Sequence, residues 1–321
     1  MPDLGADPRG ARLMLDLRRM SLLCDLAEVG SVTAVAERRS ITSSAVSQQL
    51  RVLEDEVGAV LLRREGRTLG LTPSGLVLVE HARRVLKAVD ETLSAVAATR
   101  DRAAGRVAVA SFNMGIPLLA VPLMRRLRIA EPGIRVEVQQ QTSPASLRLL
   151  RRGEVDIAVT CSYDFLGHEV LGGLTSETLI FEPLVLLAPA QWRQRVRTGG
   201  LAALAEAPWV TGPPDSGLGV AVTRLANDTG FTARVAHRLV GAQNICEVAA
   251  TEVAAAVVPL LAVPDRLAGL IVPGVDLGTR TISAVVRDGR RADPTMTSVL
   301  HTLGAIADEA LAGSAEWSVA S

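Results

Sequence analysis

Apolar residues recur at helical spacing through the first part of the chain. The first stripe consists of Leu17, Met20, Leu23, Cys24 and Ala27. It stops at Gly30, a residue that readily ends a helix. Ser31 can cap a second, short helix, and Thr42 can cap a third helix that ends at Gly58. Three short amphipathic helices with tight connections predict a helix-turn-helix module.

Two short apolar segments, 60–62 and 68–71, follow this module and flank an arginine-rich turn, which predicts a two-stranded wing. Pro73 then opens a helix that can run to about residue 104. Its apolar positions lie three or four residues apart, close to a heptad seam, and are Leu78, Ala82, Val85, Val89, Leu93 and Val96. Such a stripe forms a dimer interface or packs on its own chain. We favour dimerisation, because a long exposed helix cannot easily hide the stripe by itself.

From Gly105 onward, short apolar strands alternate with helical segments. Strands are expected at 107–110, 134–139, 155–160, 183–189, 209–211, 238–240, 254–258 and 281–287. A closing helix is expected at 295–312. This alternation predicts an α/β region with a doubly wound parallel sheet, placed after an α-rich N-terminal part.

Composition narrows the class of protein. The chain has 321 residues, of which 48% are hydrophobic, and this predicts about two globular domains. The 34 basic and 34 acidic residues give a net charge of zero, which at first argues against nucleic-acid binding. The longest apolar run, 253–263, is too short to span a bilayer and contains Pro259. The N-terminus lacks the pattern of a signal peptide, so a cytoplasmic protein without a membrane partner is expected.

The third helix carries a polar face opposite its apolar stripe. This face consists of Ser44, Ser47, Gln48 and Arg51. Hydroxyl, amide and guanidinium groups are those that reach base edges and phosphates in the major groove of DNA. The segment 38–51 also contains three arginines and no acidic residue, so its local field is expected to be positive. The alternative is an ordinary solvated helix face, which the helix-turn-helix spacing and the basic wing make less favourable.

Several segments of this region resemble LysR-type transcriptional regulators. The matching pieces lie at 27–33, 45–50, 53–58, 64–67, 71–75 and 82–86. Weaker matches lie at 105–110, 131–134 and 153–159, so the resemblance covers essentially the whole chain from residue 12. It implies a winged helix-turn-helix domain at 12–71, a linker and dimerisation helix at 72–104, and an effector-binding domain at 105–321. The last of these would be similar to type 2 periplasmic binding proteins, with subdomain I at 105–180 and 281–321 and subdomain II at 181–280.

The resemblance also implies partners: a double-stranded DNA operator, a small-molecule effector, further copies of the chain as a homodimer or homotetramer, and RNA polymerase if the protein is an activator. Base reading is implied for 43–48 and phosphate contact for the wing arginines. The expected DNA-binding residues are Ser31, Thr33, Thr42, Ser43, Ser44, Ser47, Gln48, Arg51, Arg64 and Arg67. Members of the family often carry Gln and Pro where this chain has Ser43 and Ser44, and the shorter side chains make fewer bidentate base contacts.

An effector is expected beyond the carboxyl ends of the strands, where open α/β sheets bind ligands. The expected effector-binding residues are Ser111, Phe112, Asn113, Gln141, Thr142, Ser143, Cys161, Thr211, Gly212 and Gln243. Hydroxyls and amides dominate this set, which favours an anionic small molecule such as a carboxylate. The alternative for each residue is a plain capping role in its loop.

Three other functions were weighed against a DNA-binding regulator. Cys161 and Cys246 could form a redox pair, as in peroxide-sensing members of the family, although free cysteines are more often small buried hydrophobes. The third cysteine, Cys24, lies far from both, and without a CxxC pair no disulfide framework, metal site or cofactor is expected. A solute-binding protein would need a signal peptide. No catalytic motif supports an enzyme.

Overall fold

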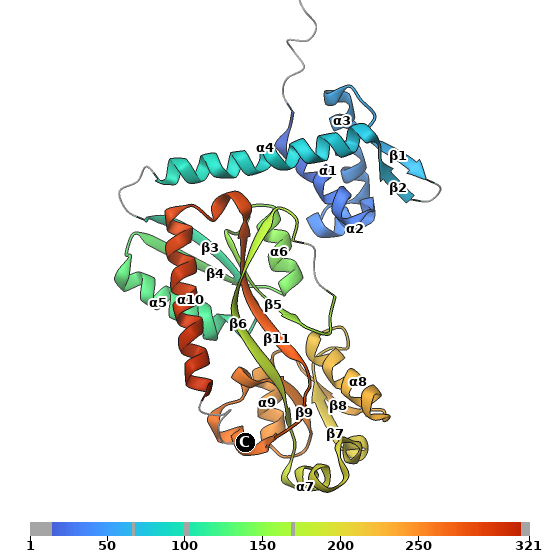
Figure 1. The fold of residues 1–321 in the computed structure, drawn as a ribbon, viewed down its shortest axis with the longest axis vertical. Helices are drawn as coiled ribbons and strands as arrows, with labels where there is room; N and C mark the ends of the chain where they lie inside the picture. The colour runs from blue at the N-terminus through green and yellow to red at the C-terminus, as the bar shows by residue number, and fades with distance from the viewer. Residues whose placement is uncertain (1–14, 66–67, 99–102, 168–170, 316–321) are drawn as a thin grey trace, which may run out of the picture. The chain divides into compact units, whose positions relative to one another are not determined.

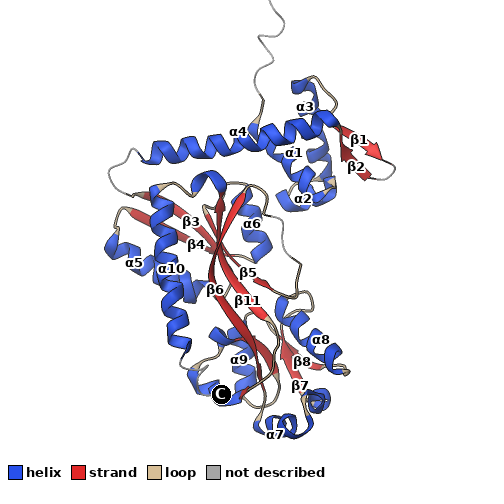
Figure 2. Cartoon of the chain, viewed as in Figure 1, coloured by secondary structure: helices blue, strands red, loops and turns tan. Residues whose placement is uncertain are grey.

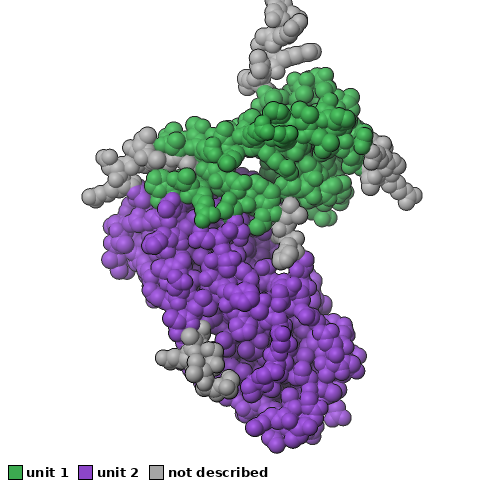
Figure 3. Space-filling view, in the orientation of Figure 1, with its two compact units in different colours: residues 1–101, 170–175, 287–294 green, residues 102–169, 176–286, 295–321 purple. Residues whose placement is uncertain are grey.

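The computed structural model describes four stretches of the chain, 15–65, 68–98, 103–167 and 171–315. Two compact units are distinguished in it (Figure 3). The first unit comprises residues 1–101, 170–175 and 287–294. The second unit comprises residues 102–169, 176–286 and 295–321.

The first unit contains a helix-turn-helix with a wing and a long helix (Figure 1). Its elements are α1 (Leu17–Val29), α2 (Val32–Arg39), α3 (Ser43–Val57), β1 (Leu62–Glu65), β2 (Thr68–Leu71) and α4 (Pro73–Ala98). The carboxylate of Asp16 caps α1, and Gly30 and Gly58 end α1 and α3 in the left-handed conformation that glycine adopts without strain. Leu50 and Leu53 on α3 are buried in the core of this unit.

The apolar stripe of α4 divides into two halves. Ala82 is fully buried and Leu78 packs on the core of the first unit, where α4 contacts α1. Farther along, Val85, Leu93 and Val96 are exposed on the helix surface. The stripe therefore packs on its own chain at Leu78 and Ala82, is half-buried at Val89, and presents the other three apolar side chains to solvent. The described part of the helix extends to Ala98, and residues 103 and 104 are not helical.

The second unit is built on a seven-stranded sheet with the order β10-β6-β11-β5-β3-β4, with β9 paired to β6, and on a separate parallel pair, β7-β8 (Figure 2). The strands are β3 (Gly105–Ser111), β4 (Ile134–Gln140), β5 (Ile157–Tyr163), β6 (Leu174–Leu187), β7 (Pro208–Thr211), β8 (Arg234–Arg238), β9 (Ala256–Pro259), β10 (Ile271–Val272) and β11 (Thr279–Arg287). Pairing is parallel for β4-β3-β5, whereas β11 returns antiparallel to β5. The parallel arrangement expected from the sequence thus holds for β4-β3-β5 and for the pair β7-β8, whereas β9 and β10 pair antiparallel with β6.

Helices pack along the strands of this unit, which has two separate hydrophobic cores (Figure 1). They are α5 (Val121–Ala130), α6 (Ser143–Arg151), α7 (Ala190–Gly199), α8 (Gly217–Thr229), α9 (Ala242–Ala250) and α10 (Pro294–Ala315). The strand β6 contributes Leu179 and Ile180 to one core and Leu184 and Leu186 to the other. We refer to the part around the core that contains Ile180 as the first lobe and to the part around the core that contains Leu184 as the second lobe.

Several elements differ from the sequence expectation. The strand β6 begins at Leu174, well before residue 183, because the polar run Thr175–Thr178 hides the strand signal of its first half. The helices α7, α8 and α9 were not foreseen, and a strand was expected at 238–240, whereas β8 ends at Arg238. Among the described residues, no helix is long and apolar enough to cross a membrane.

Candidate functional site

The helix α3 presents a polar face to solvent in its N-terminal half. Thr42 caps the helix by accepting a hydrogen bond from the amide of Ala45 at 3.1 Å. Ser43, Gln48 and Arg51 are exposed. Because Leu50 and Leu53 anchor the opposite face in the core, this polar face is held outward by packing.

Two of the expected base-reading hydroxyls already have partners in the helix. The Ser47 hydroxyl donates to the carbonyl of Ser43 at 2.9 Å, and its side chain is half-buried. The Ser44 hydroxyl lies 2.9 Å from that of Thr42. Gln48 and Arg51 therefore carry the longest side chains available for contacts outside this helix.

The positive field expected over 38–51 is wrong in part. Arg38 contacts the carboxylates of Asp25 at 3.4 Å and Glu28 at 2.7 Å, and Arg39 forms an ion pair with Asp25. Both acids lie on α1 with side chains only 7% exposed, so these two arginines tie α2 to α1. Arg51 is the arginine of this segment that remains exposed. Counting charges along the sequence missed this pairing because Glu28 and Asp25 precede Arg38 by 10 and 13 residues.

The other expected DNA-binding residues fall into two groups. Ser31 caps α2 through the amide of Ala34 at 3.1 Å, and Thr33 is exposed beside it. On the wing, Arg67 and the side chain of Arg64 lie outside the described residues. The wing itself is anchored to α3, since Glu54 accepts hydrogen bonds from the amides that begin β1.

In the second unit, the ends of β3, β4 and β5 come together as expected. The amide of Gln141 donates to the carbonyl of Ser111 at 2.9 Å. The hydroxyl of Ser143 accepts from the amide of Cys161 at 2.9 Å. Thr142 is exposed and caps α6, which is the plain capping role considered above. These residues form the edge of the first lobe at which the strands end.

The first lobe reaches the second lobe at the start of α9. Phe112 and Asn113 follow β3, and a Cβ atom on Gly241 would lie 3.0 Å from the side-chain oxygen of Asn113. Gln243, in the first turn of α9, is exposed close to this contact along the chain. Asn113 therefore lies next to the backbone that begins α9, two residues before Gln243.

Two residues of the second lobe that were expected to bind the effector already have hydrogen-bond partners within the chain. The Thr211 side chain is 1% exposed, and its hydroxyl donates to the carbonyl of Leu218 at 2.9 Å. The carbonyl of Gly212 accepts from the Arg238 guanidinium at 3.3 Å. Thr211 thus holds the loop before α8, and its hydroxyl is not presented to the junction.

Sequence reasoning missed the most strongly buried charges of the junction. Arg280 on β11 donates to one carboxylate oxygen of Glu182 on β6, from Nε at 3.0 Å and from Nη2 at 2.5 Å. The other oxygen of Glu182 accepts from the amide of Leu261 at 2.8 Å. Arg280 also lies 5.7 Å from the centre of the Phe112 ring. A single Arg and Glu 98 residues apart give no signal in the sequence.

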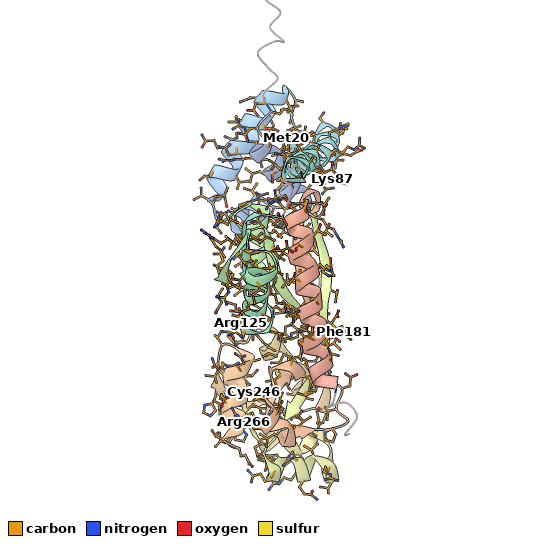
Figure 4. The ribbon with its side chains drawn as sticks, turned by 90° about the vertical axis from the view of Figure 1, so that its left-hand side faces the viewer. Met20, Lys87, Arg125, Phe181, Cys246 and Arg266 are labelled. Carbon is orange, nitrogen blue, oxygen red and sulfur yellow. The ribbon has the colours of Figure 1, made fainter. Side chains whose placement is uncertain are left out.

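The cysteines have little thiolate character. Burial raises the pKa of the Cys246 thiol to about 12, and this thiol lies 3.3 Å from the carbonyl of Ala262 in the second-lobe core (Figure 4). Burial also raises the pKa of Cys161, against the opposing charge of Arg280, and Cys161 packs on the first-lobe core. Since the thiolate is the reactive form, these environments do not support the redox pair. Among the described residues, no cluster of three or more His, Cys, Asp or Glu could hold a metal ion.

Comparisons with known proteins match both units. The family model described as a bacterial regulatory helix-turn-helix protein of the lysR family matches residues 17–76, and the LysR substrate binding domain matches residues 100–307.

Two curated relatives are regulators. The nitrogen assimilation regulatory protein nac of Klebsiella aerogenes is 29% identical over 174 residues, 54% of this chain and 55% of that protein. The transcriptional regulator IlvR of Caulobacter vibrioides is 28% identical over 199 residues, 62% of this chain and 66% of that protein. The matches thus span about half to two thirds of these relatives.

Among solved structures, ArgP from Mycobacterium tuberculosis is similar, with a TM-score of 0.53 at 24% identity. The alignment covers 92% of this chain and 98% of that chain. This likeness shows a shared fold.

Proposed function

Because this chain belongs to the LysR family, we propose that it is a transcriptional regulator that binds operator DNA through its first unit and a small-molecule effector through its second. The observation that carries the DNA part is the exposed polar face of α3, held outward by Leu50 and Leu53. Its place of action would be the cytoplasm, where the operator is. The contact with RNA polymerase stays a prediction.

We assign base reading to Gln48 and phosphate contact to Arg51. An exposed glutamine amide can make a bidentate contact with adenine, and an arginine at the same helix face can reach the backbone. Ser43 and Thr33 are exposed and can add shorter contacts. The wing arginines Arg64 and Arg67 remain candidates for phosphate contact on the grounds of the family resemblance.

The exposed half of the α4 stripe supports self-association. Val85, Leu93 and Val96 are 41%, 52% and 61% exposed, at a spacing that suits a helix-to-helix seam. A dimer would place two copies of α3 in successive major grooves, about 34 Å apart on a pseudo-palindromic site. Whether dimers pair further into tetramers stays a prediction.

The effector is assigned to the junction of the two lobes. Asn113, Gln141, Ser143 and Cys161 line its first-lobe side, and Gln243 lies at the start of α9 on the other side. The cation buried at this junction, Arg280, is already neutralised by Glu182. The anionic character of the effector therefore rests on the residue types alone.

The DNA-binding proposal is tested with the full chain and the DNA segment upstream of its own coding sequence. Gln48→Ala should reduce the preference for this segment over a scrambled one by about 5- to 150-fold, the equivalent of 1–3 kcal/mol for one bidentate contact. Gln191→Ala, an exposed glutamine on α7 in the second unit, is the matched control and should leave the preference unchanged. Competition gel-shift titration at fixed salt measures both. Equal preference in wild type and Gln48→Ala would overturn the assignment of α3 as the reading helix.

A further inference from the structure

The ring of Tyr163 bridges the two lobes of the second unit. Tyr163 is the last residue of β5 in the first lobe, and Gly217 is the first residue of α8 in the second. A Cβ atom on Gly217 would overlap three carbon atoms of the Tyr163 ring. The ring therefore lies directly on the backbone at the start of α8, a closeness that only glycine permits.

Aromatic residues are rare in this chain and gather at this contact. Aromatic side chains make up 2% of the sequence, which contains a single tyrosine. The Phe165 ring lies 5.5 Å from that of Tyr163, and Phe112 and Tyr163 both pack against the second-lobe core although they belong to first-lobe strand ends. The guanidinium of Arg224, on α8, lies 5.3 Å from the centre of the Phe165 ring. The largest flat side chains at the junction thus come from the first lobe and pack on the second.

The same ring is connected to the strands that join the lobes. Tyr163 is paired with Arg280 in the register of β5 and β11. Arg280 is buried and forms an ion pair with Glu182 on β6. Glu182 in turn accepts a hydrogen bond from the amide of Leu261 in the second lobe. A displacement of the Tyr163 ring would therefore disturb the buried ion pair that joins the two connecting strands. Partial loss of the hydrogen bonds of a buried ion pair is costly.

We propose that Tyr163 is a positioning residue of the effector junction: its ring, seated on Gly217, holds the two lobes closed without a ligand, and the effector acts by competing with this contact. The second clause rests on the proposed effector function, whereas the first stands on geometry alone. A ligand that binds the open arrangement better than the closed one shifts the population by that difference in affinity. Through Arg280 and Glu182, the position of the ring then sets the angle between the lobes.

The contact is tested by filling the space beneath the ring. Gly217 is not in the left-handed backbone conformation and is the first residue of a helix, so the backbone at this position is compatible with alanine. Only the overlap of the added Cβ with the Tyr163 ring disfavours the substitution. Gly217→Ala should raise hydrogen exchange of the amides at 217–222 by at least about tenfold in the full chain without DNA or added ligand. Gly199→Ala, at the end of α7 with nothing within 4 Å of its added Cβ, is the matched control and should exchange as wild type. Wild-type exchange in Gly217→Ala would overturn the proposal.

A double variant separates release of the contact from simple damage to α8. Tyr163→Ala should also raise exchange at 217–222, because the ring is gone. Adding Gly217→Ala to Tyr163→Ala should then cause no further rise, since the new Cβ has room, and this non-additivity identifies the pair as coupled. If the effects of the two substitutions simply add, Gly217→Ala acts through something other than the ring and the proposal fails.

The regulatory clause has its own readout. A reporter driven by the upstream segment should change its effector-free output in Tyr163→Ala and keep it in Gly199→Ala. Altered exchange with unaltered reporter output, while gel shifts still show operator binding, would overturn the role of the contact in regulation. Failure of operator binding in wild type would instead overturn the proposed function and leave the exchange result intact, so the two failures are distinguishable.

Discussion

The surface of α3 and the junction between the lobes are built in opposite ways. The α3 surface comes from one run of 15 residues, and its exposed polar side chains point away from the core. The junction draws on the ends of β3 and β5, the starts of α8 and α9, and two connecting strands. Its charged pair, Arg280 and Glu182, has side chains 3% and 2% exposed. On α3 the side chains proposed to contact DNA are separate from those that stabilise the fold, whereas at the junction the same groups would serve both.

The two sites also differ in how their arginines are paired with acidic residues. Around α3, Arg38 and Arg39 are held by Asp25 and Glu28, so the helix-turn-helix is braced by ion pairs beside its exposed face. Arg51 on that face is left exposed. At the junction, Arg280 forms an ion pair with Glu182 and lies 5.7 Å from the centre of the Phe112 ring. Under the proposed function, binding of an effector could therefore act directly on a stabilising ion pair only in the second unit, where Arg280 and Glu182 lie at the proposed site.

The largest expected effect is a contrast between two arginine truncations. Arg280→Ala leaves Glu182 buried without its partner and should reduce the free energy of unfolding of the second unit by about 3–5 kcal/mol. Arg51→Ala should change the stability of the first unit by less than about 0.5 kcal/mol, because its side chain is exposed. It should instead weaken operator binding and reduce the slope of log K against log salt by about 1.

The measurement can separate the two units. The described part of the first unit contains no tryptophan, whereas Trp192 and Trp209 are buried in the second. Tryptophan fluorescence in urea therefore reports the second unit, and salt titration of the gel shift reports Arg51. Arg266→Ala is the control, since Arg266 and Glu247 form an ion pair more than half exposed that contributes at most about 1 kcal/mol (Figure 4). Equal losses in Arg280→Ala and Arg266→Ala would erase the contrast.

The sequence predicted the first unit well because its signals are local. Helical spacing, the cap Thr42 and the stop at Gly58 lie within one segment, and the structure has α3 at Ser43–Val57. The strand β6 was recognised only over its second half, since its first half begins with the polar run Thr175–Thr178 and only then contributes Leu179 and Ile180 to the first-lobe core. The family and the fold class were reached from motifs in 27–86 and the strand alternation after Gly105, and the family models bear them out.

The site residues were predicted less evenly. Polar residues at strand ends follow from the topology rule, so Asn113, Ser143 and Cys161 could be expected at the junction. Tyr163 and Gly217 could not, because their contact depends on how two lobes close and neither residue belongs to a motif. The same limit applied to Arg38 and Arg39, whose partners lie on another helix. Spacing predicts which face a residue occupies, but not which distant side chain neutralises it.

A second prediction concerns an exception to the contrast, the exposed apolar half of α4. This surface belongs to the first unit, and in the proposed dimer a second copy of the chain would bury it. Leu93→Asp would place a charge in the helix seam and should raise the dimer dissociation constant at least about tenfold, since an unpaired charge is costly to bury.

Leu76→Asp is the matched control on the same helix. Leu76 is 59% exposed but does not belong to the seam spacing, so its substitution should leave the dissociation constant unchanged. Sedimentation equilibrium over a concentration series measures both variants. A dimer that tolerates Leu93→Asp as well as Leu76→Asp would place the interface elsewhere and return the α4 stripe to the role of a solvent-exposed face.

The smallest expected effect tests whether the contrast extends to the cores. Cys24 lies in the first unit and Cys246 in the second, and burial raises their thiol pKa values to about 11 and about 12. A thiol with a raised pKa stays protonated in the folded state, while the unfolded chain loses its proton above about pH 9. The unfolded state then binds fewer protons, so stability falls as pH rises, by about 1 kcal/mol per thiol at pH 10.

Single Ala variants at these two positions should flatten this fall in the unit that carries each thiol. Urea unfolding at pH 8 and pH 10, by fluorescence for the second unit and by far-ultraviolet circular dichroism for the whole chain, measures the difference. Comparing each variant with itself at the two pH values cancels the cavity that the substitution leaves. Equal flattening in both units means that the cores behave alike and that the contrast belongs to the functional surfaces alone. A fall that persists in Cys246→Ala would mean that its thiol is not the group that titrates in the second unit.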